Sequence, residues 1–144
     1  MHGSDDAVKR VLIVEDDDRL REALQELLTA SGYETISAED GIEALDWLAR
    51  LPMDLIIVDL LMPRMGGHQL IKRIRESVEW ATTPILLLSG YADVASYRRL
   101  PVDSVLLKPF RLPDLLEKVQ EMIGSGGGSA DDAGASPASP DDAL

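Results

Sequence analysis

The sequence contains no cysteine among its 144 residues. Disulfide bonds and thiolate metal sites are therefore excluded, which favours a protein of a reducing compartment such as the cytoplasm. Long apolar runs are also missing, because no stretch approaches the roughly 20 apolar residues that cross a bilayer. The first ten residues hold no apolar signal core, so we expect neither membrane insertion nor secretion.

Basic side chains are scarce, since 14 lysines and arginines stand against 26 aspartates and glutamates. The formal net charge of −12 argues against direct binding to nucleic acid, whose phosphates would repel the chain. Residues 124–144 consist mainly of glycine, serine, alanine, proline and aspartate, which predicts a flexible tail or the start of a linker. We expect disorder in residues 1–8 as well, and one folded domain over residues 9–123.

Short apolar runs alternate with helical patterns through this domain. The pattern predicts strands at residues 11–14, 33–37, 54–59, 84–88 and 104–107, with amphipathic helices after them and a weaker helix over residues 91–100. Ile42 and Val78 match the apolar spacing of the second and third helices, and aspartates are predicted to cap the first two, Asp17 or Asp18 and Asp40. Strand–helix alternation with short connections implies right-handed crossovers and an α/β fold with a doubly wound parallel sheet.

Carboxylates follow two of the predicted strands. Asp59 ends a strand that is apolar on both faces, and Glu15 and Asp16 directly follow the first strand. If these two strands are parallel neighbours, the three carboxylates meet at one edge of the sheet, where ligands of such folds bind. Carboxylates this close repel one another unless a hard cation lies between them, so the sequence predicts a magnesium-type site.

Two further strand ends add a hydroxyl and an ammonium group. Ser89 follows the strand at 84–88, and Lys108 follows the strand at 104–107. On the same edge, these groups are suited to hold a phosphoryl group on Asp59. Asp17 and Asp18, by contrast, are interpreted as helix-capping and solvated charges.

Four motifs together carry a family resemblance: Glu15-Asp16, Asp59 with Met62-Pro63, Ser89-Gly90, and Lys108-Pro109-Phe110. In this order and spacing they resemble the CheY-like receiver domain of two-component response regulators, over residues 9–123. The resemblance implies a flavodoxin-like (βα)5 fold with strand order 2-1-3-4-5. It also implies that Asp59 accepts a phosphoryl group from a histidine kinase or a histidine phosphotransfer protein, with Mg²⁺ or alternatively Mn²⁺. The outcome would be altered binding of a downstream protein, without turnover of a small molecule.

The resemblance also implies residue roles. Asp16, Asp59 and the backbone carbonyl of Leu61 would bind the metal, and Glu15 would act through a metal-bound water. Lys108 would contact the phosphoryl group across a cis Lys108-Pro109 peptide. A conformational switch would use Ser89 and position 105, and the residues that tune hydrolysis of the acyl phosphate would be Leu61 and Tyr91.

Two departures from the family pattern stand out. Position 105 is valine where receivers often carry an aromatic residue, so we expect a smaller conformational change or one carried by residues 91–100. Gly66-Gly67 replaces the usual acidic residue before glycine, which predicts a weaker start to the third helix.

Two rival functions are weighed against a signalling receiver. A phosphohydrolase of the haloacid dehalogenase type needs a second aspartate two residues after the nucleophile, where this chain has Leu61. A degenerate receiver that binds partners without phosphorylation is the other rival. The intact set of Asp16, Asp59, Ser89 and Lys108 argues against it, whereas Val105 keeps it open.

Overall fold

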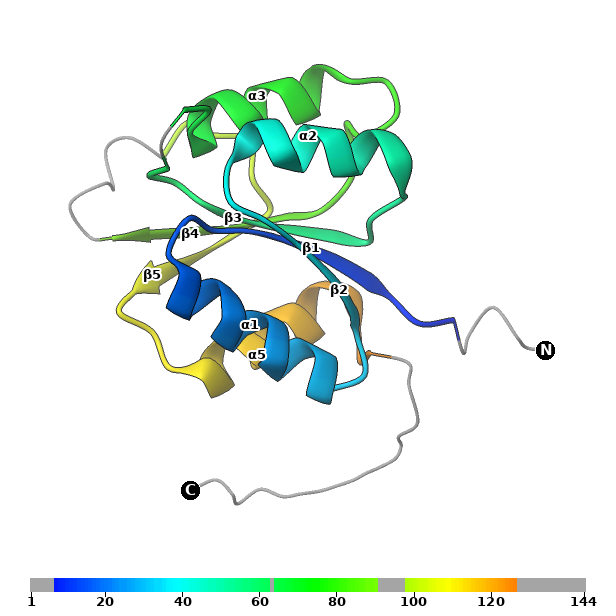
Figure 1. Cartoon of the computed structure of the whole chain (residues 1–144), viewed down its shortest axis with the longest axis vertical. Coiled ribbons are helices and arrows are strands. Elements are labelled where there is room, and N and C mark those ends of the chain that lie inside the picture. The colour runs from blue at the N-terminus through cyan, green and yellow to red at the C-terminus, as the bar shows by residue number, and fades with distance from the viewer. Residues whose placement is uncertain (1–6, 63, 91–97, 127–144) are drawn as a thin grey trace.

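The computed structural model describes residues 7–62, 64–90 and 98–126. Five parallel strands form one sheet in the order β2-β1-β3-β4-β5, which confirms the expected topology (Figure 1). The strands are β1 (Arg10–Val14), β2 (Glu34–Ala38), β3 (Leu55–Asp59), β4 (Ile85–Gly90) and β5 (Ser104–Lys108). The described helices are α1 (Asp18–Ala30), α2 (Gly41–Arg50), α3 (Gly67–Glu76) and α5 (Leu112–Ile123). Among the described residues, no helix has both the length and the apolar character that a membrane span requires.

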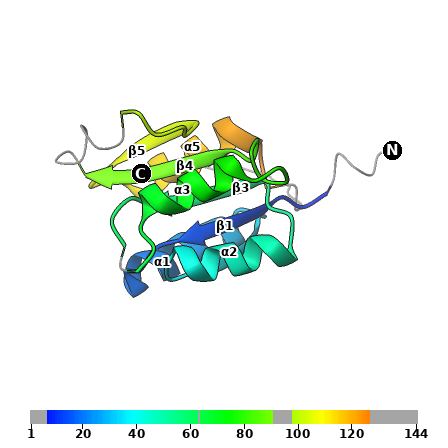
Figure 2. The same ribbon diagram turned by 90° about the horizontal axis from the view of Figure 1, so that it is seen from above.

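Helices cover both faces of the sheet, as Figures 1 and 2 show, with α2 and α3 on one face and α1 and α5 on the other. A hydrophobic core lies on each face of the sheet. Alternate residues of the central strands pack into one core or the other because successive strand side chains point to opposite faces. Ile56 and Val58 of β3 pack with α2 and α3, whereas Leu55 and Ile57 pack with α1 and α5. Burial on both faces explains why β3 is apolar up to Asp59.

Helix starts follow the predicted caps in two cases. Asp17 caps α1 by accepting hydrogen bonds from the backbone N–H groups of Arg19 and Leu20. Asp40 caps α2 by accepting from the N–H of Glu43 at 2.9 Å. These bonds satisfy donors that the first helical turn leaves without intrahelical partners. At α3 the cap residue is Gly66, and none of the described side chains caps this helix.

Two apolar residues assigned to buried helix faces lie in solvent instead. Val78 is 99% exposed because α3 ends at Glu76, where the backbone of Ser77 turns to an extended conformation. Ile42 is 55% exposed, since it lies on the side of α2 opposite the buried Ala44. Apolar spacing alone predicted burial wrongly at both positions.

Arg75 holds the chain that follows α3. Its guanidinium group donates to the backbone carbonyls of Ala81, Thr83 and Pro101 at 2.7–3.0 Å and pairs with Asp103 at 2.8 Å. Asp103 in turn accepts from the N–H of Ile85, the first residue of β4. Arg75 is therefore the link between α3 and the starts of β4 and β5.

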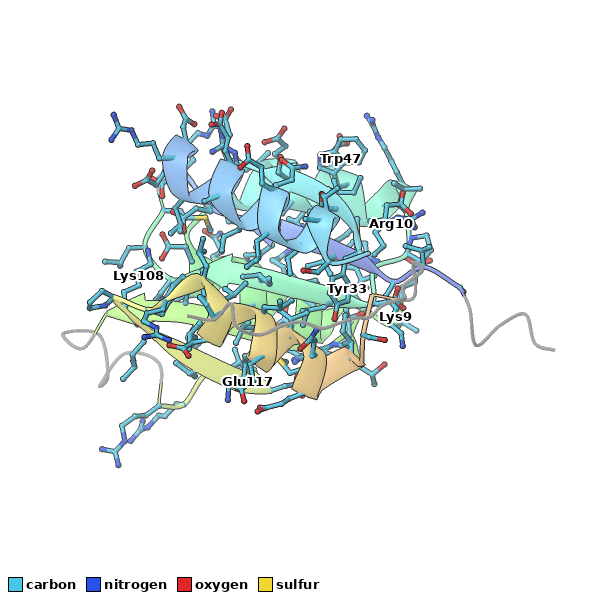
Figure 3. All side chains as sticks on the ribbon, turned by 90° about the horizontal axis from the view of Figure 1, so that it is seen from below. Lys9, Arg10, Tyr33, Trp47, Lys108 and Glu117 are labelled. Carbon is cyan, nitrogen blue, oxygen red and sulfur yellow. The ribbon has the colours of Figure 1, made fainter. Side chains whose placement is uncertain are left out.

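The first residues of the predicted tail contact the sheet end opposite the acidic strand ends. Tyr33 donates its hydroxyl proton to the carbonyl of Gly124, and the N–H of Lys9 donates to the carbonyl of Gly126 at 3.3 Å. Gly126 is buried against the backbone of Gly32. Figure 3 shows Lys9 and Tyr33 at the end of the molecule away from Lys108. The rest of the predicted tail, residues 127–144, lies outside the described residues.

Candidate functional site

The acidic site lies where β1 and β3 end side by side. Val14 of β1 is in register with Val58 of β3, so the residues that follow these two leave the sheet together. Glu15, Asp16 and Asp59 each offer a carboxylate oxygen, and these atoms all lie within 4.8 Å of one another. Glu15 and Asp59 are buried, at 1% and 5% exposure, whereas Asp16 is exposed. The sheet order therefore produces the juxtaposition that the carboxylates suggested.

A cleft of about 380 Å³ opens at this edge of the sheet. It is lined by Glu15, Asp16, Asp17, Asp59, Leu61, Gly90 and Lys108. Residues from the ends of β1, β3, β4 and β5 therefore share one cavity, as expected for ligand sites of open parallel sheets.

Lys108, the last residue of β5, reaches into the acidic cluster. Its Nζ atom donates to Oδ1 of Asp59 at 3.0 Å and lies 3.7 Å from Oε1 of Glu15. Burial by itself would lower the pKa of Lys108, but the hydrogen bond to Asp59 and the charges of the three carboxylates outweigh burial and raise it. The ammonium group therefore stays charged. The Lys108-Pro109 peptide is cis, as predicted.

Glu15 is a buried carboxylate whose surroundings oppose its ionisation. Burial and the charge of Asp59 raise the pKa of Glu15 from 4.5 to about 7, against the lowering effects of the Asp17 N–H and Lys108. Its Oε1 atom is buried and accepts no hydrogen bond from the described residues. Three carboxylates, one of them with a buried oxygen that accepts no hydrogen bond within the described part of the chain, are a ligand set that fits a hard divalent cation such as Mg²⁺.

The neighbouring aspartates have structural partners instead. Asp17 accepts from two N–H groups of α1, and Asp18 pairs with Arg21. Arg21 also donates to the backbone carbonyl of Glu15 at 2.9 Å, which ties the acidic turn to α1. The capping and surface roles expected for these two aspartates are thus confirmed.

The remaining predicted site residues lie around this cluster or outside the described residues. Ser89 is buried in β4, directly after Leu88, which is in register with Asp59. Leu61 lines the cleft and is 63% exposed. Val105 packs against the core beneath α2 and α3. Tyr91 falls within residues 91–97, which lie outside the described residues.

Sequence reasoning missed how closely α3 approaches this site. A Cβ atom on Gly67 would lie 2.8 Å from the carbonyl oxygen of Asp59 and 2.8 Å from Cα of Leu60. The N–H of Gly67 donates to the carbonyl of Leu60 at 3.0 Å, so the helix start rests directly on the backbone of the acidic strand. The glycine pair was a visible signal, but its second member is needed for space rather than for capping.

Comparison with known proteins agrees with this geometry. The family model for the response regulator receiver domain matches residues 11–120. This chain belongs to that family. The Regulator of RpoS from Escherichia coli K12 is 39% identical over 118 residues, which are 80% of this chain and 34% of that protein. The receiver therefore spans about a third of that longer relative.

Solved structures show the same fold. Chemotaxis protein CheY4 of Vibrio cholerae is 32% identical, with a TM-score of 0.74 over 81% of this chain and 99% of that one. The receiver domain of sensor histidine kinase PA1611 from Pseudomonas aeruginosa is 28% identical, with a TM-score of 0.76 over 83% of this chain and 100% of that one. Its structure contains a magnesium ion in the active site cleft. The flavodoxin-like fold of a two-component receiver is thus established for this chain.

The raised pKa of Glu15 leads to a pH-dependent prediction for the receiver. Because the folded-state pKa of about 7 lies above the unfolded value of 4.5, the group's contribution to stability is complete below pH 4.5. It is lost as pH rises through 7. A divalent cation needs the ionised form, so Mg²⁺ should raise the melting temperature more at pH 8 than at pH 5.5.

The measurement is thermal unfolding with EDTA or with Mg²⁺ across this pH range. Glu15→Gln serves as the control, because a neutral amide should remove most of the pH dependence from the metal-free protein. An Mg²⁺-induced shift that is equal at pH 5.5 and pH 8 would contradict the prediction.

Proposed function

We propose that Asp59 is the phosphoacceptor of this receiver. The observation that supports the assignment is the 3.0 Å contact between Lys108 Nζ and Asp59 Oδ1, beside two further carboxylates at the cleft. The carboxylate of Asp59 thus contacts the ammonium group of Lys108 and also belongs to a potential metal site. That arrangement suits an oxygen that must attack a phosphoryl group and then carry its negative charge.

The proposed reaction is phosphoryl transfer from a phosphohistidine of a histidine kinase or a histidine phosphotransfer protein. A carboxylate oxygen of Asp59 forms the new P–O bond and the P–N bond breaks, with its electron pair staying on the ring nitrogen. The imidazole leaves as a neutral group because its other ring nitrogen carries a proton. Lys108 stays charged throughout and pairs with the phosphoryl oxygens as they approach. The hydroxyl of Ser89 donates to a phosphoryl oxygen once the acyl phosphate has formed.

The divalent cation would be bound by Asp16, Asp59 and the backbone carbonyl of Leu61, and by Glu15 through a water molecule. When bound there, Mg²⁺ or Mn²⁺ supplies positive charge that offsets the charge of the phosphoryl oxygens. Leu61 and Tyr91 would limit the access of water to the acyl phosphate and so slow its hydrolysis.

The consequence of phosphorylation would be a change in binding of a downstream protein in the cytoplasm. Ser89 and Val105 occupy the switch positions, and the smaller valine predicts a smaller rearrangement there than an aromatic residue gives. The acidic charge opposes direct contact with nucleic acid. The domain would thus act as a signalling switch and would turn over no small-molecule substrate beyond its own phosphorylation.

The test of this function is incubation with acetyl phosphate and Mg²⁺ followed by intact mass measurement. We expect one added phosphoryl group on the wild type and none on Asp59→Asn, which has nearly the same shape but lacks the nucleophilic carboxylate. EDTA should prevent the gain. Equal phosphorylation of the wild type and Asp59→Asn would refute the assignment of the acceptor.

A further inference from the structure

Asp40 and Arg64 form an ion pair between two elements that border the acidic cleft. Asp40, the cap of α2, is only 1% exposed, and its Oδ2 atom pairs with the guanidinium group of Arg64. Arg64 belongs to the loop between β3 and α3, and its side chain is 65% exposed. Burial of an unpaired carboxylate destabilises a fold, so the ion pair with Asp40 favours conformations that keep Arg64 next to α2.

The backbone of the same loop is also attached to α2. The N–H of Gly41 donates to the carbonyl of Met65 at 3.1 Å, directly beside the ion pair. Arg64 adopts a φ of 58°, in the left-handed region that residues with a side chain rarely occupy. Two consecutive loop residues are therefore held at the start of α2, and one of them has an unfavourable backbone conformation.

The other end of the loop is fixed to the sheet. The N–H of Leu60 donates to the carbonyl of Leu88 at 3.0 Å, and the carbonyl of Leu60 accepts from Gly67. Leu61, which lines the cleft, follows Leu60 directly and precedes the attachment at Arg64. In the sequence, Leu61 thus lies between the attachment of Leu60 to the sheet and the attachment of Arg64 and Met65 to α2.

We propose that the Asp40–Arg64 ion pair positions the loop after Asp59 so that the backbone carbonyl of Leu61 completes the cation site. This inference rests on the proposed function, which assigns that carbonyl to the cation. Arg64 is a positioning residue, because it acts through the loop backbone and its own contact is with Asp40. The pair also offsets the cost of the left-handed backbone at Arg64.

The variants that test this inference remove the charge of one partner of the ion pair at a time. Arg64→Asn removes the guanidinium group and keeps a residue that tolerates left-handed backbone. Asp40→Asn removes the buried charge and keeps a side chain that caps helices well. The control is Arg50→Ala, which breaks the exposed pair with Asp46, 3.1 Å long, at the far end of the same helix.

The measured quantity is the Mg²⁺ dissociation constant by titration calorimetry, together with the melting temperature in EDTA. Each single variant is expected to raise the dissociation constant by roughly tenfold, as loss of supporting contacts around metal ligands commonly does. The double variant should bind Mg²⁺ as each single variant does, because both substitutions remove one interaction. Arg64→Lys should restore part of the affinity, and Arg50→Ala should leave it unchanged.

A purely structural pair would lower the melting temperature and leave the Mg²⁺ dissociation constant unchanged, which would overturn the proposal. The proposal would also be overturned if the double variant raised the Mg²⁺ dissociation constant by the product of the two single effects, since the two residues would then act separately. A wild type that binds Mg²⁺ but accepts no phosphoryl group would refute the proposed function, while the variants would still decide the positioning role. A wild type that binds no Mg²⁺ would refute both.

Discussion

Replacing Lys108 with methionine is expected to slow phosphorylation of Asp59 by about 100-fold, the effect of removing one charged group that stabilises a transition state. Lys108 is the cation that contacts Asp59, at 3.0 Å, and its raised pKa keeps it charged. Without it, the phosphoryl oxygens would approach three carboxylates with less opposing charge. The rate of mass gain with acetyl phosphate measures the effect.

The affinity for Mg²⁺ should not fall in Lys108→Met, although phosphorylation slows. The ammonium group occupies Oδ1 of Asp59 and repels a divalent cation, so Lys108→Met should bind Mg²⁺ at least as tightly as the wild type. Slower phosphorylation with intact Mg²⁺ binding separates loss of a catalytic charge from misfolding. Lys118→Met is the matched control, because Lys118 pairs with Glu121 on α5 and does not line the cleft.

The prediction for Lys108 fails if the methionine variant is phosphorylated at the wild-type rate. It also fails if Lys118→Met slows the reaction to the same degree, because the effect would then follow from net charge alone.

Gly67→Ala is expected to destabilise the domain by about 2 kcal/mol or more, as overpacking against rigid neighbours does. The added methyl group would meet the carbonyl oxygens of Asp59 and Leu60 and Cα of Leu60, all at 2.8–2.9 Å. These are backbone atoms that no side-chain rotation can move. The start of α3 must therefore shift away from β3, and the acidic site should be disturbed with it.

Helix propensity by itself predicts the opposite sign for this substitution, because alanine stabilises helices by up to ~1 kcal/mol relative to glycine. The direction of change in urea unfolding therefore distinguishes the two effects. An unchanged or higher free energy of unfolding for Gly67→Ala would show that α3 accommodates the methyl group.

Gly66→Ser is the matched control one residue earlier. A Cβ atom there meets Met62 O at an ordinary 3.4 Å, and the backbone φ of −80° suits any residue. The serine hydroxyl can cap α3, which no side chain of the described residues does, so a gain of a few tenths of a kcal/mol is expected. Substitution should thus lower the free energy of unfolding at Gly67 and raise it at Gly66.

The sequence by itself determined the elements and the chemistry of the acidic edge. Apolar runs and helical spacing are local signals, and they predicted the strands and most of the helices. Parallel strands end at one edge of a sheet, so Glu15, Asp16, Asp59 and Lys108 were expected to meet once the order 2-1-3-4-5 was assumed. Their meeting is what the structure shows.

Local signals failed where the fate of a residue depends on distant parts of the chain. Val78 keeps the apolar spacing of α3, but the helix ends before it, and Ser77 and Arg75 organise the following turn. Arg75 reads as a surface charge in the sequence, yet its partners lie up to 28 residues away. Nothing in a helical pattern specifies such partners.

Only the tertiary structure decided how closely the elements approach around Asp59. The contact of Gly67 with Leu60, the pairing of Asp40 with Arg64 and the raised pKa of Glu15 each depend on distances between separate elements. Steric overlap, desolvation and ion pairing change over a few ångströms, whereas residue types and spacing specify only which elements form and in what order. The sequence therefore determined which groups meet at the site, and three-dimensional packing determined how they are held there.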